Sequence, residues 1–307
     1  MEPFPLPPCE PGFQDLHEVA AAVEAWARSD AMAELVAEFG GGAMTDLDAL
    51  AGFSAVWDYR AGVKERFDTE RIDFEPERDA RVRTLMHGLG MGGPPAPKHG
   101  RYDHILVLGG GIRVALGRTD YTARLLAAGT TTRTLTGLGS HRHRDDREFR
   151  EAERLGLGTI ETEADMMAEA FRKFLALGEP TNVHEHHRAW PGDRNVLAAP
   201  STRPPLRANT ADTLIGWAEI VHEPKPDERV LLVTNAPYVR HQHCDAIRLL
   251  GSRYGCGIET VGYDDAATAA WGRPLSTTEL LQEVRSSILA MRNLHRHAQD
   301  SAATTAR

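Results

Sequence analysis

The fold class can be predicted from the segment Ile105-Leu106-Val107-Leu108-Gly109-Gly110-Gly111 and its counterparts along the chain. Four consecutive apolar residues are typical of a short strand that is buried on both faces, and the glycines mark the end of that strand. Similar runs recur along the chain with helix candidates between them: strand candidates at 133–136, 195–198, 230–234 and 257–261, and helix candidates near 121–128, 163–177, 211–221 and 244–254. This alternation predicts an α/β fold, a Rossmann-like parallel sheet of about five strands with helices on both faces.

The sequence before this stretch has a different texture. Up to about Gly88 it contains helical periodicity and no strand candidate, and a segment rich in glycine and proline follows, from Gly88 to Gly100. We therefore predict a helical N-terminal domain over residues 1–97 and a Rossmann-like α/β domain over residues 98–307. The second domain should end in one long helix from Thr277 to His297, with Ser276 as its N-cap.

Composition excludes several classes of protein. The chain has 307 residues, 41% of them hydrophobic, which is enough for a buried core, and its net charge of −9 disfavours a nucleic-acid binder. No apolar run is long enough to cross a membrane, the start of the chain lacks the features of a signal peptide, and the three cysteines form no Cys-x-x-Cys pair. We expect a cytoplasmic protein with no membrane or nucleic-acid partner; self-association as a homo-oligomer is left open.

The glycine turn is the first candidate for ligand binding, because ligands of parallel sheets bind beyond the carboxyl ends of the strands. Gly109, Gly110 and Gly111 would let backbone N–H groups approach an anion at the start of the next helix, with Arg113 close by. The turn is not a dinucleotide fingerprint, because Val114 stands where the third glycine should be, and no P-loop lysine follows it. The alternative is that these glycines only form a tight turn.

Polar residues also follow the other predicted strands. Glu163 would begin a helix capped by Thr162, Asn209 and Thr210 stand at another helix start, and Thr234 and Asn235 end a strand. Each has a structural alternative, since acidic residues favour a helix N-terminus and Asn is a common N-cap.

In this order the motifs resemble the family of domain of unknown function 218 (DUF218), the YdcF-like proteins. The resemblance covers roughly residues 103–264 and rests on the following segments: Val107–Gly111 with Arg118, Thr136-Gly137-Leu138-Gly139, Thr162-Glu163-Ala164, Asn209-Thr210 and Val233-Thr234-Asn235. Two positions depart from the family pattern, because Tyr238 stands where the family has His and His241 where it has Arg. The N-terminal helical part lies outside the resemblance.

The resemblance implies a Rossmann-like fold and a nucleotide- or S-adenosylmethionine-like ligand. We expect an enzyme that catalyses group transfer or hydrolysis, with Glu163, His241 and Tyr238 as catalytic residues. The expected ligand-binding residues are Gly109, Gly110, Gly111, Arg113, Arg118, Gly137, Asn209, Thr210, Thr234 and Asn235. A protein that senses such a ligand without catalysis is the first alternative.

The 14 histidines raise a second alternative, a metal-dependent hydrolase. His184-Glu185-His186-His187, His141 with His143, and His241 with His243 are grouped, but the helical H-E-x-x-H signature of zinc enzymes is absent. The segment around His184 precedes Pro191-Gly192 and is predicted to be a loop. The sequence therefore assigns no metal ligand, and no metal cofactor is expected.

Overall fold

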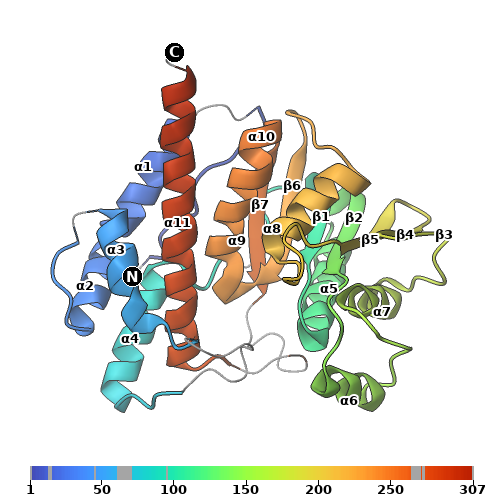
Figure 1. Cartoon of the computed structure of the whole chain (residues 1–307), viewed down its shortest axis with the longest axis horizontal. Helices are drawn as coiled ribbons and strands as arrows, with labels where there is room; N and C mark the ends of the chain where they lie inside the picture. The colour runs from blue at the N-terminus through green and yellow to red at the C-terminus, as the bar shows by residue number, and fades with distance from the viewer. Residues whose placement is uncertain are drawn as a thin grey trace.

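The computed structural model describes residues 2–12, 16–44, 46–60, 71–94, 96–263, 271 and 274–305. At its centre is a seven-stranded sheet in the order β3-β4-β5-β2-β1-β6-β7 (Figure 1). The strands are β1 (Arg101–Leu108), β2 (Thr131–Ser140), β3 (Asn182–His184), β4 (His187–Trp190), β5 (Arg194–Ala199), β6 (Arg229–Asn235) and β7 (Gly257–Tyr263). The α/β class and all five predicted strands are confirmed.

The predicted strands run parallel, with β1 in the middle. Ile105 of β1 is in register with Leu135 of β2 on one side and with Leu231 of β6 on the other. Beyond them, β5 pairs in parallel with β2, and β7 with β6. The carboxyl ends of these five strands therefore lie along one edge of the sheet, which we call the carboxyl edge; the opposite edge is the amino edge.

The loop predicted around His184 is wrong, because β3 and β4 form an antiparallel hairpin against β5. Every residue of β3 is exposed, so this strand lacks the apolar alternation by which a strand is detected in sequence. The position of the hairpin is set by the pairing of β4 with the edge of β5. The residues of the hairpin themselves carry no pattern that would predict this pairing.

The helices connect the strands or precede the sheet. They are α1 (Leu16–Ala27), α2 (Asp30–Glu38), α3 (Leu47–Phe53), α4 (Pro76–Gly88), α5 (Ile112–Ala127), α6 (Asp146–Arg154), α7 (Glu163–Leu175), α8 (Thr210–Gly216), α9 (Val239–Ala246), α10 (Ser252–Tyr254) and α11 (Thr277–Thr305). Short 3-10 or π turns are η1 (Ser54–Trp57), η3 (Trp217–Val221), η4 (Ala236–Tyr238) and η5 (Ile247–Gly251). The expected cap of the last helix is confirmed, since Ser276 Oγ accepts a hydrogen bond from the Glu279 N–H at 3.3 Å.

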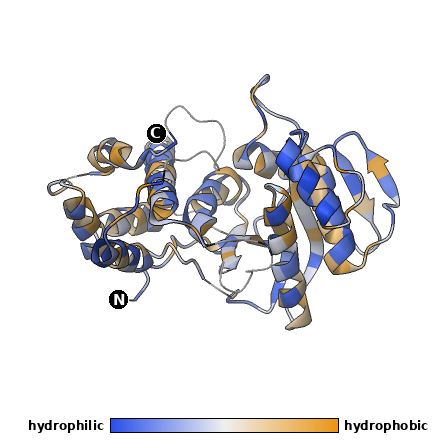
Figure 2. Ribbon diagram, turned by 90° about the horizontal axis from the view of Figure 1, so that it is seen from below, coloured by the Kyte–Doolittle hydropathy of each residue, from blue (hydrophilic) through white to orange (hydrophobic). Residues whose placement is uncertain are grey.

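Each face of the sheet carries its own hydrophobic core. On one face Ile105, Val107 and Leu231 pack with residues of α5 and α7, among them Leu116 and Phe171. On the other face Leu106, Leu108 and Leu232 belong to a larger core that includes α8, α9, α11 and the N-terminal helices. Figure 2 shows the sheet and its nearer helices on one side of the molecule and the N-terminal helices on the other.

Helix α11 joins the two parts of the chain. It packs against α9 on one side and against α1, α3 and α4 on the other, and Figure 1 shows it standing between them. This helix lies on the C-terminal side of the boundary predicted between residues 97 and 98. Its residues Leu281, Val284 and Ile288 are nevertheless buried in one core with the N-terminal helices. The division into two domains stays a prediction.

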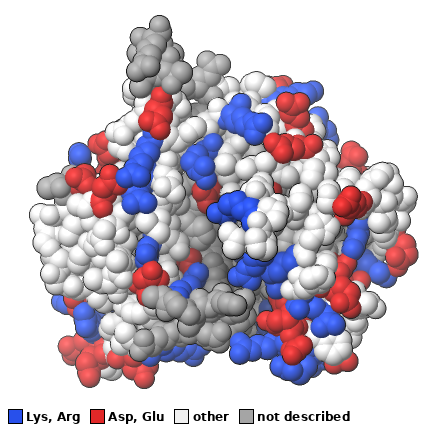
Figure 3. Space-filling view, viewed as in Figure 1, with Lys and Arg blue, Asp and Glu red and all other residues white. Residues whose placement is uncertain are grey.

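No helix among the described residues is both long enough and apolar enough to cross a membrane. On the face drawn in Figure 3, acidic and basic side chains are interspersed.

Candidate functional site at the carboxyl edge

Glu163 opens α7, and its side chain is not needed to cap that helix. The N-cap is Thr162, whose hydroxyl accepts from the Asp165 N–H at 3.3 Å, while the Asp165 carboxylate accepts from the Thr162 N–H at 2.7 Å. This reciprocal capping box satisfies the helix start without Glu163. The carboxyl group of Glu163 instead points at the sheet.

The environment of Glu163 favours its protonated form. Burial raises its pKa, and the nearby Glu148 carboxylate raises it further, while a hydrogen bond from Ser140 and the charges of Arg142 and Arg118 lower it. The net direction is upward. Ser140, the last residue of β2, donates its hydroxyl to Glu163 Oε2 at 2.5 Å. A carboxyl group held in this way can carry a proton closer to neutral pH than an exposed glutamate.

The glycine turn lies directly against this carboxyl group. A Cβ atom on Gly109 would lie 2.2 Å from the Leu138 carbonyl oxygen and 3.0 Å from Glu163 Oε1, so only glycine fits there. A Cβ atom on Gly111 would lie 3.0 Å from Glu148 Oε1. The first-turn N–H groups of α5, which have no partner within their own helix, follow this turn. Backbone donors and the Glu163 carboxyl thus meet at one place.

Glu148 is balanced by a partner of its own. Arg142 donates two hydrogen bonds to its carboxylate, at 2.9 Å and 2.8 Å, in the two-pronged geometry that suits a guanidinium. The same carboxylate closes the capping box of α6 with Asp145.

Arg118 ties the ends of β1 and β6 together. This side chain is buried, donates to Asn235 Oδ1 at 2.8 Å and to the Leu108 carbonyl oxygen at 2.8 Å, and also donates to the Gly109 carbonyl oxygen. Asn235 in turn donates to the Tyr263 hydroxyl at 2.7 Å. This guanidinium donates its hydrogen bonds to groups within the protein, so its direct role is to position the glycine turn.

Tyr238 lies beside Arg118 just after the end of β6, and His241 is on α9, which packs against α11. The Arg118 guanidinium carbon is 5.9 Å from the centre of the Tyr238 ring, which is in turn 5.9 Å from the His241 ring. His241 Nδ1 lies 3.8 Å from Glu283 Oε2 of α11. The structure thus gathers Glu163, Gly109 and Arg118 around the turn and places His241 against α11.

The remaining predicted residues have structural surroundings. The half-exposed Arg113 pairs with Glu151 of α6 at 2.9 Å. Gly137 lies inside β2, where a Cβ atom would come within 2.9 Å of the Met167 side chain. The buried Thr234 donates its hydroxyl to Gln242 at 2.5 Å.

Asn209 caps α8, and Thr210 is the first residue of that helix. Asn209 Oδ1 accepts from the Asp212 N–H at 3.1 Å, and the Asp212 carboxylate accepts from the Asn209 N–H at 2.9 Å. This arrangement is the one expected under the capping alternative.

Sequence reasoning missed Ser140, Arg142, Glu148 and Tyr263. Ser140 and Tyr263 are the last residues of β2 and β7, so the strand-end rule that selected Asn235 would also have found them. Arg142 and Glu148 belong to a run of charged residues that is typical of a solvated loop. Only their contact in the folded structure distinguishes them from the other charged residues of that run.

The grouped histidines of the sequence form pairs. His141 Nε2 lies 2.8 Å from His186 Nδ1, and the rings of His184 and His187 stack with their centres 6.3 Å apart. Among the residues that the structure describes, the group of three side chains able to hold a metal ion is a different one, formed by His104, His222 and Glu228. It lies toward the amino edge, away from Glu163.

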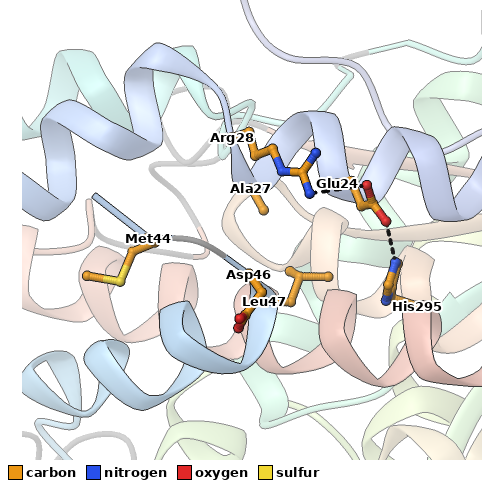
Figure 4. A pocket seen from close by; sticks show the side chains of 7 residues that line it. All are labelled: Glu24, Ala27, Arg28, Met44, Asp46, Leu47 and His295. Carbon is orange, nitrogen blue, oxygen red and sulfur yellow. Dashed lines mark hydrogen bonds and ion pairs between the residues drawn. The ribbon is translucent and has the colours of Figure 1, made fainter. Parts of the chain in front are cut away.

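A small cavity between α1, α3 and α11 is shown in Figure 4. Glu24 lines it and pairs with Arg28 at 3.5 Å and with His295 at 2.9 Å. Its volume of about 60 Å³ is far below that of typical ligand pockets, and it lies among the N-terminal helices. We assign it no functional role.

The structure is that of an α/β protein with a partly buried glutamate, Glu163, at the carboxyl edge of a mainly parallel sheet. A family model described as the Rv3785 N-terminal domain matches residues 10–90. The uncharacterized protein Rv3785 of Mycobacterium tuberculosis (strain H37Rv) is 31% identical over 333 aligned residues, which cover 92% of this chain and 91% of that protein. The uncharacterized protein Mb3814 of Mycobacterium bovis matches to the same extent. The chain therefore belongs to the Rv3785 family. No solved structure matches it.

These matches correct the resemblance to DUF218, which is wrong. The model that matches covers the N-terminal helical part, which that resemblance left unexplained. Several of the shared motifs are requirements of the fold: Thr162 and Asn209 cap helices, and Gly109 permits a close approach between β1 and β2. Such features recur in their order in parallel α/β proteins, because each strand end is followed by a helix start.

Proposed function

We propose that the protein is an enzyme that binds a small molecule of nucleotide or adenosyl type through its phosphate or carboxylate group at the carboxyl edge, and that it uses Glu163 as a general acid in group transfer or hydrolysis. The observation that carries the proposal is the desolvated Glu163 carboxyl, bonded to Ser140 and placed against the backbone of Gly109. A perturbed carboxyl at a strand end beside backbone donors is a typical candidate for an active site.

The local charges suit an anion. Two carboxyl groups flank the glycine turn, but Glu148 is neutralised by Arg142, and the raised pKa of Glu163 favours its uncharged form. The N-terminus of α5 adds the positive end of a helix dipole. A phosphate or carboxylate at the turn would therefore meet donors and little repulsion.

The chemistry assigned to Glu163 is proton donation to a leaving group. Oε2 accepts from Ser140, which leaves Oε1, the oxygen nearer Gly109, to carry the proton toward a bound molecule. Ser140 is a positioning residue in this scheme. A cytoplasmic location is part of the proposal and agrees with three cysteines that are all buried and free.

The test begins with a thermal-shift screen of the full-length protein against S-adenosylmethionine, nucleoside diphosphates and nucleoside triphosphates. A compound that binds the native state raises the melting temperature by mass action. Compounds that do so are then incubated with the protein, and products are followed by chromatography. We expect turnover of a compound that stabilises the protein, and its absence for every binder would favour the sensor alternative.

Glu163→Gln keeps the shape of the side chain and removes the acidic proton that the carboxyl group could donate. We expect turnover to fall by about 100-fold or more. The matched control is Glu161→Gln, since Glu161 is exposed, precedes α7 and pairs only weakly with Arg144 at 3.6 Å. Equal activity of both variants would exclude the acid role of Glu163. In Ser140→Ala the pH–rate profile should shift to higher pH, because the hydrogen bond that lowers the pKa of Glu163 is lost.

A further inference from the structure

A second group of chemically active side chains lies toward the amino edge. His104 comes from β1, His222 follows η3, and Glu228 directly precedes β6. His104 Nε2 lies 3.0 Å and His222 Nε2 lies 2.8 Å from the same carboxylate atom, Glu228 Oε2. One ligand atom from each residue lies within 4.8 Å of the others. His104 and Glu228 are buried, whereas His222 is partly exposed.

The partners of His104 favour a lone pair on its Nε2 atom. Thr134 Oγ1 lies 2.8 Å from Nδ1 and can accept a hydrogen bond from a proton on that atom, and the Arg133 guanidinium, which can only donate, lies 3.1 Å from Nε2. In this tautomer the Nε2 lone pair faces a carboxylate oxygen at 3.0 Å. Two acceptors at that distance repel one another unless a proton or a cation lies between them.

We propose that His104, His222 and Glu228 bind a zinc ion, through the two Nε2 atoms and Glu228 Oε2. Two imidazoles and a carboxylate are a ligand set that zinc uses in proteins with an open fourth position. One surrounding contact matches the second shell of such sites, because Thr134 orients the first imidazole. The same Arg133 nitrogen that contacts His104 Nε2 also pairs with Glu228 Oε1, so a zinc ion would displace this guanidinium. The Arg133 side chain is 47% exposed and has room to turn outward.

A pocket of about 340 Å³ adjoins this cluster, large enough for a small ligand. His222, Arg133 and Thr134 contribute to its wall, together with His187, Asp193 and Asn195. A zinc ion with two neutral imidazoles and one carboxylate keeps one positive charge, so the fourth position would take water or an anionic group of a molecule in this pocket. This site is independent of the carboxyl-edge site and of the function proposed there.

The test uses the full-length protein after dialysis against a chelator. Cobalt(II) is added as a spectroscopic probe, and zinc affinity is then measured by competition with a chromophoric chelator. We expect about one ion per chain with the visible absorption of a four- or five-coordinate nitrogen–oxygen site. Only the weak absorption of cobalt in six-coordinate, water-rich surroundings would overturn the proposal.

His222→Ala is the informative variant, because His222 is partly exposed and its loss disturbs the core least. We expect zinc affinity to fall by at least about 100-fold and the cobalt spectrum to disappear. The matched control is His187→Ala, which removes another histidine of the same pocket, bonded to Asn195, and should leave binding intact. A site that survives in His222→Ala but is lost in His186→Ala would place the metal at the His141–His186 pair and refute the assignment.

Arg133→Gln separates a metal site from a purely ionic cluster. If zinc binds, removal of the competing positive charge should tighten binding by about 10-fold or leave it unchanged, in chains that remain folded by circular dichroism. If Glu228 serves only to pair with Arg133, neither this variant nor the unmodified chain will bind zinc. That result would overturn the proposal.

Discussion

The two edges of the sheet use polar side chains in opposite ways. At the carboxyl edge Arg118, Asn235 and Tyr263 pair donor to acceptor, so the network is complete within the protein. Toward the amino edge two imidazole nitrogens converge on one oxygen of Glu228, and a guanidinium competes for one of them. A completed network fixes the backbone beside a site, whereas convergent acceptors mark a place for a cation. Substitutions at Arg118, Glu228, Glu163 and Asn209 test this difference between the two edges.

The largest effect is expected for Arg118→Met. The substitution leaves the carbonyl oxygens of Leu108 and Gly109 and the side-chain oxygen of Asn235 without their buried donor. Each unsatisfied acceptor costs about 1–3 kcal/mol, so we expect a loss of about 4 kcal/mol in the free energy of unfolding, measured by urea denaturation. Arg113→Met, on the exposed pair with Glu151, should change it by less than about 1 kcal/mol. Similar losses in both variants would mean that the carboxyl-edge network is not cooperative.

Glu228→Gln should have an intermediate effect in chelator-treated protein. The amide oxygen can still accept from the Lys225 N–H, but the charge that binds Arg133 and the imidazoles is lost. Hydrogen bonds to charged groups contribute about 1.5–3 kcal/mol, so we expect a loss of about 2 kcal/mol, measured by urea denaturation. The exposed Glu223→Gln is the control and should behave like the unmodified chain. A more stable Glu228→Gln variant would show that the cluster is strained without a cation.

Glu163→Gln should change how stability depends on pH. Because the pKa of Glu163 is raised in the folded state, the folded chain binds more protons than the unfolded chain above the ordinary glutamate pKa. Stability therefore falls as pH rises through the folded pKa, by at most about 1.4 kcal/mol per pH unit for this single group. The variant lacks this loss. Its free energy of unfolding, measured by urea denaturation, should therefore rise relative to that of the unmodified chain as pH increases through the folded pKa. Parallel curves would show that Glu163 is ionised in the folded protein.

The smallest effect is expected for Asn209→Ala. Loss of the cap of α8 should cost about 1 kcal/mol in the free energy of unfolding, and Asn209→Asp should restore most of it, because Asp is an equally good N-cap. Calorimetry of the three chains measures both changes. If ligand binding at the carboxyl edge is lost in Asn209→Asp while stability is kept, Asn209 contacts the ligand as the sequence suggested.

Much of the fold could be predicted from local patterns. The apolar run at 105–108 and its four counterparts identify the parallel strands, and Thr162, Asn209 and Ser276 cap helices as their types suggest. The β3–β4 hairpin could not be found, because its residues are polar and its position depends on β5. The same limit applies to the candidate site: Gly109 follows a strand and Glu163 opens a helix, so both could be proposed from the sequence, whereas Arg142 and Glu148 are recognised only by their contact.

Local sequence patterns are enough to predict the α/β class, the order of the elements, the strand ends where Asn235 and the glycine turn lie, and the helix start at Glu163. These features depend on periodicity and on residues a few positions apart. Long-range packing is needed to turn Arg118 inward, to place His241 against α11 and to bring His104, His222 and Glu228 together. His104 and Glu228 lie more than a hundred positions apart in the sequence, and the three residues of the cluster form no recognisable motif. Parallel pairing of β1 with β6 brings them together, and that pairing is a property of the whole sheet.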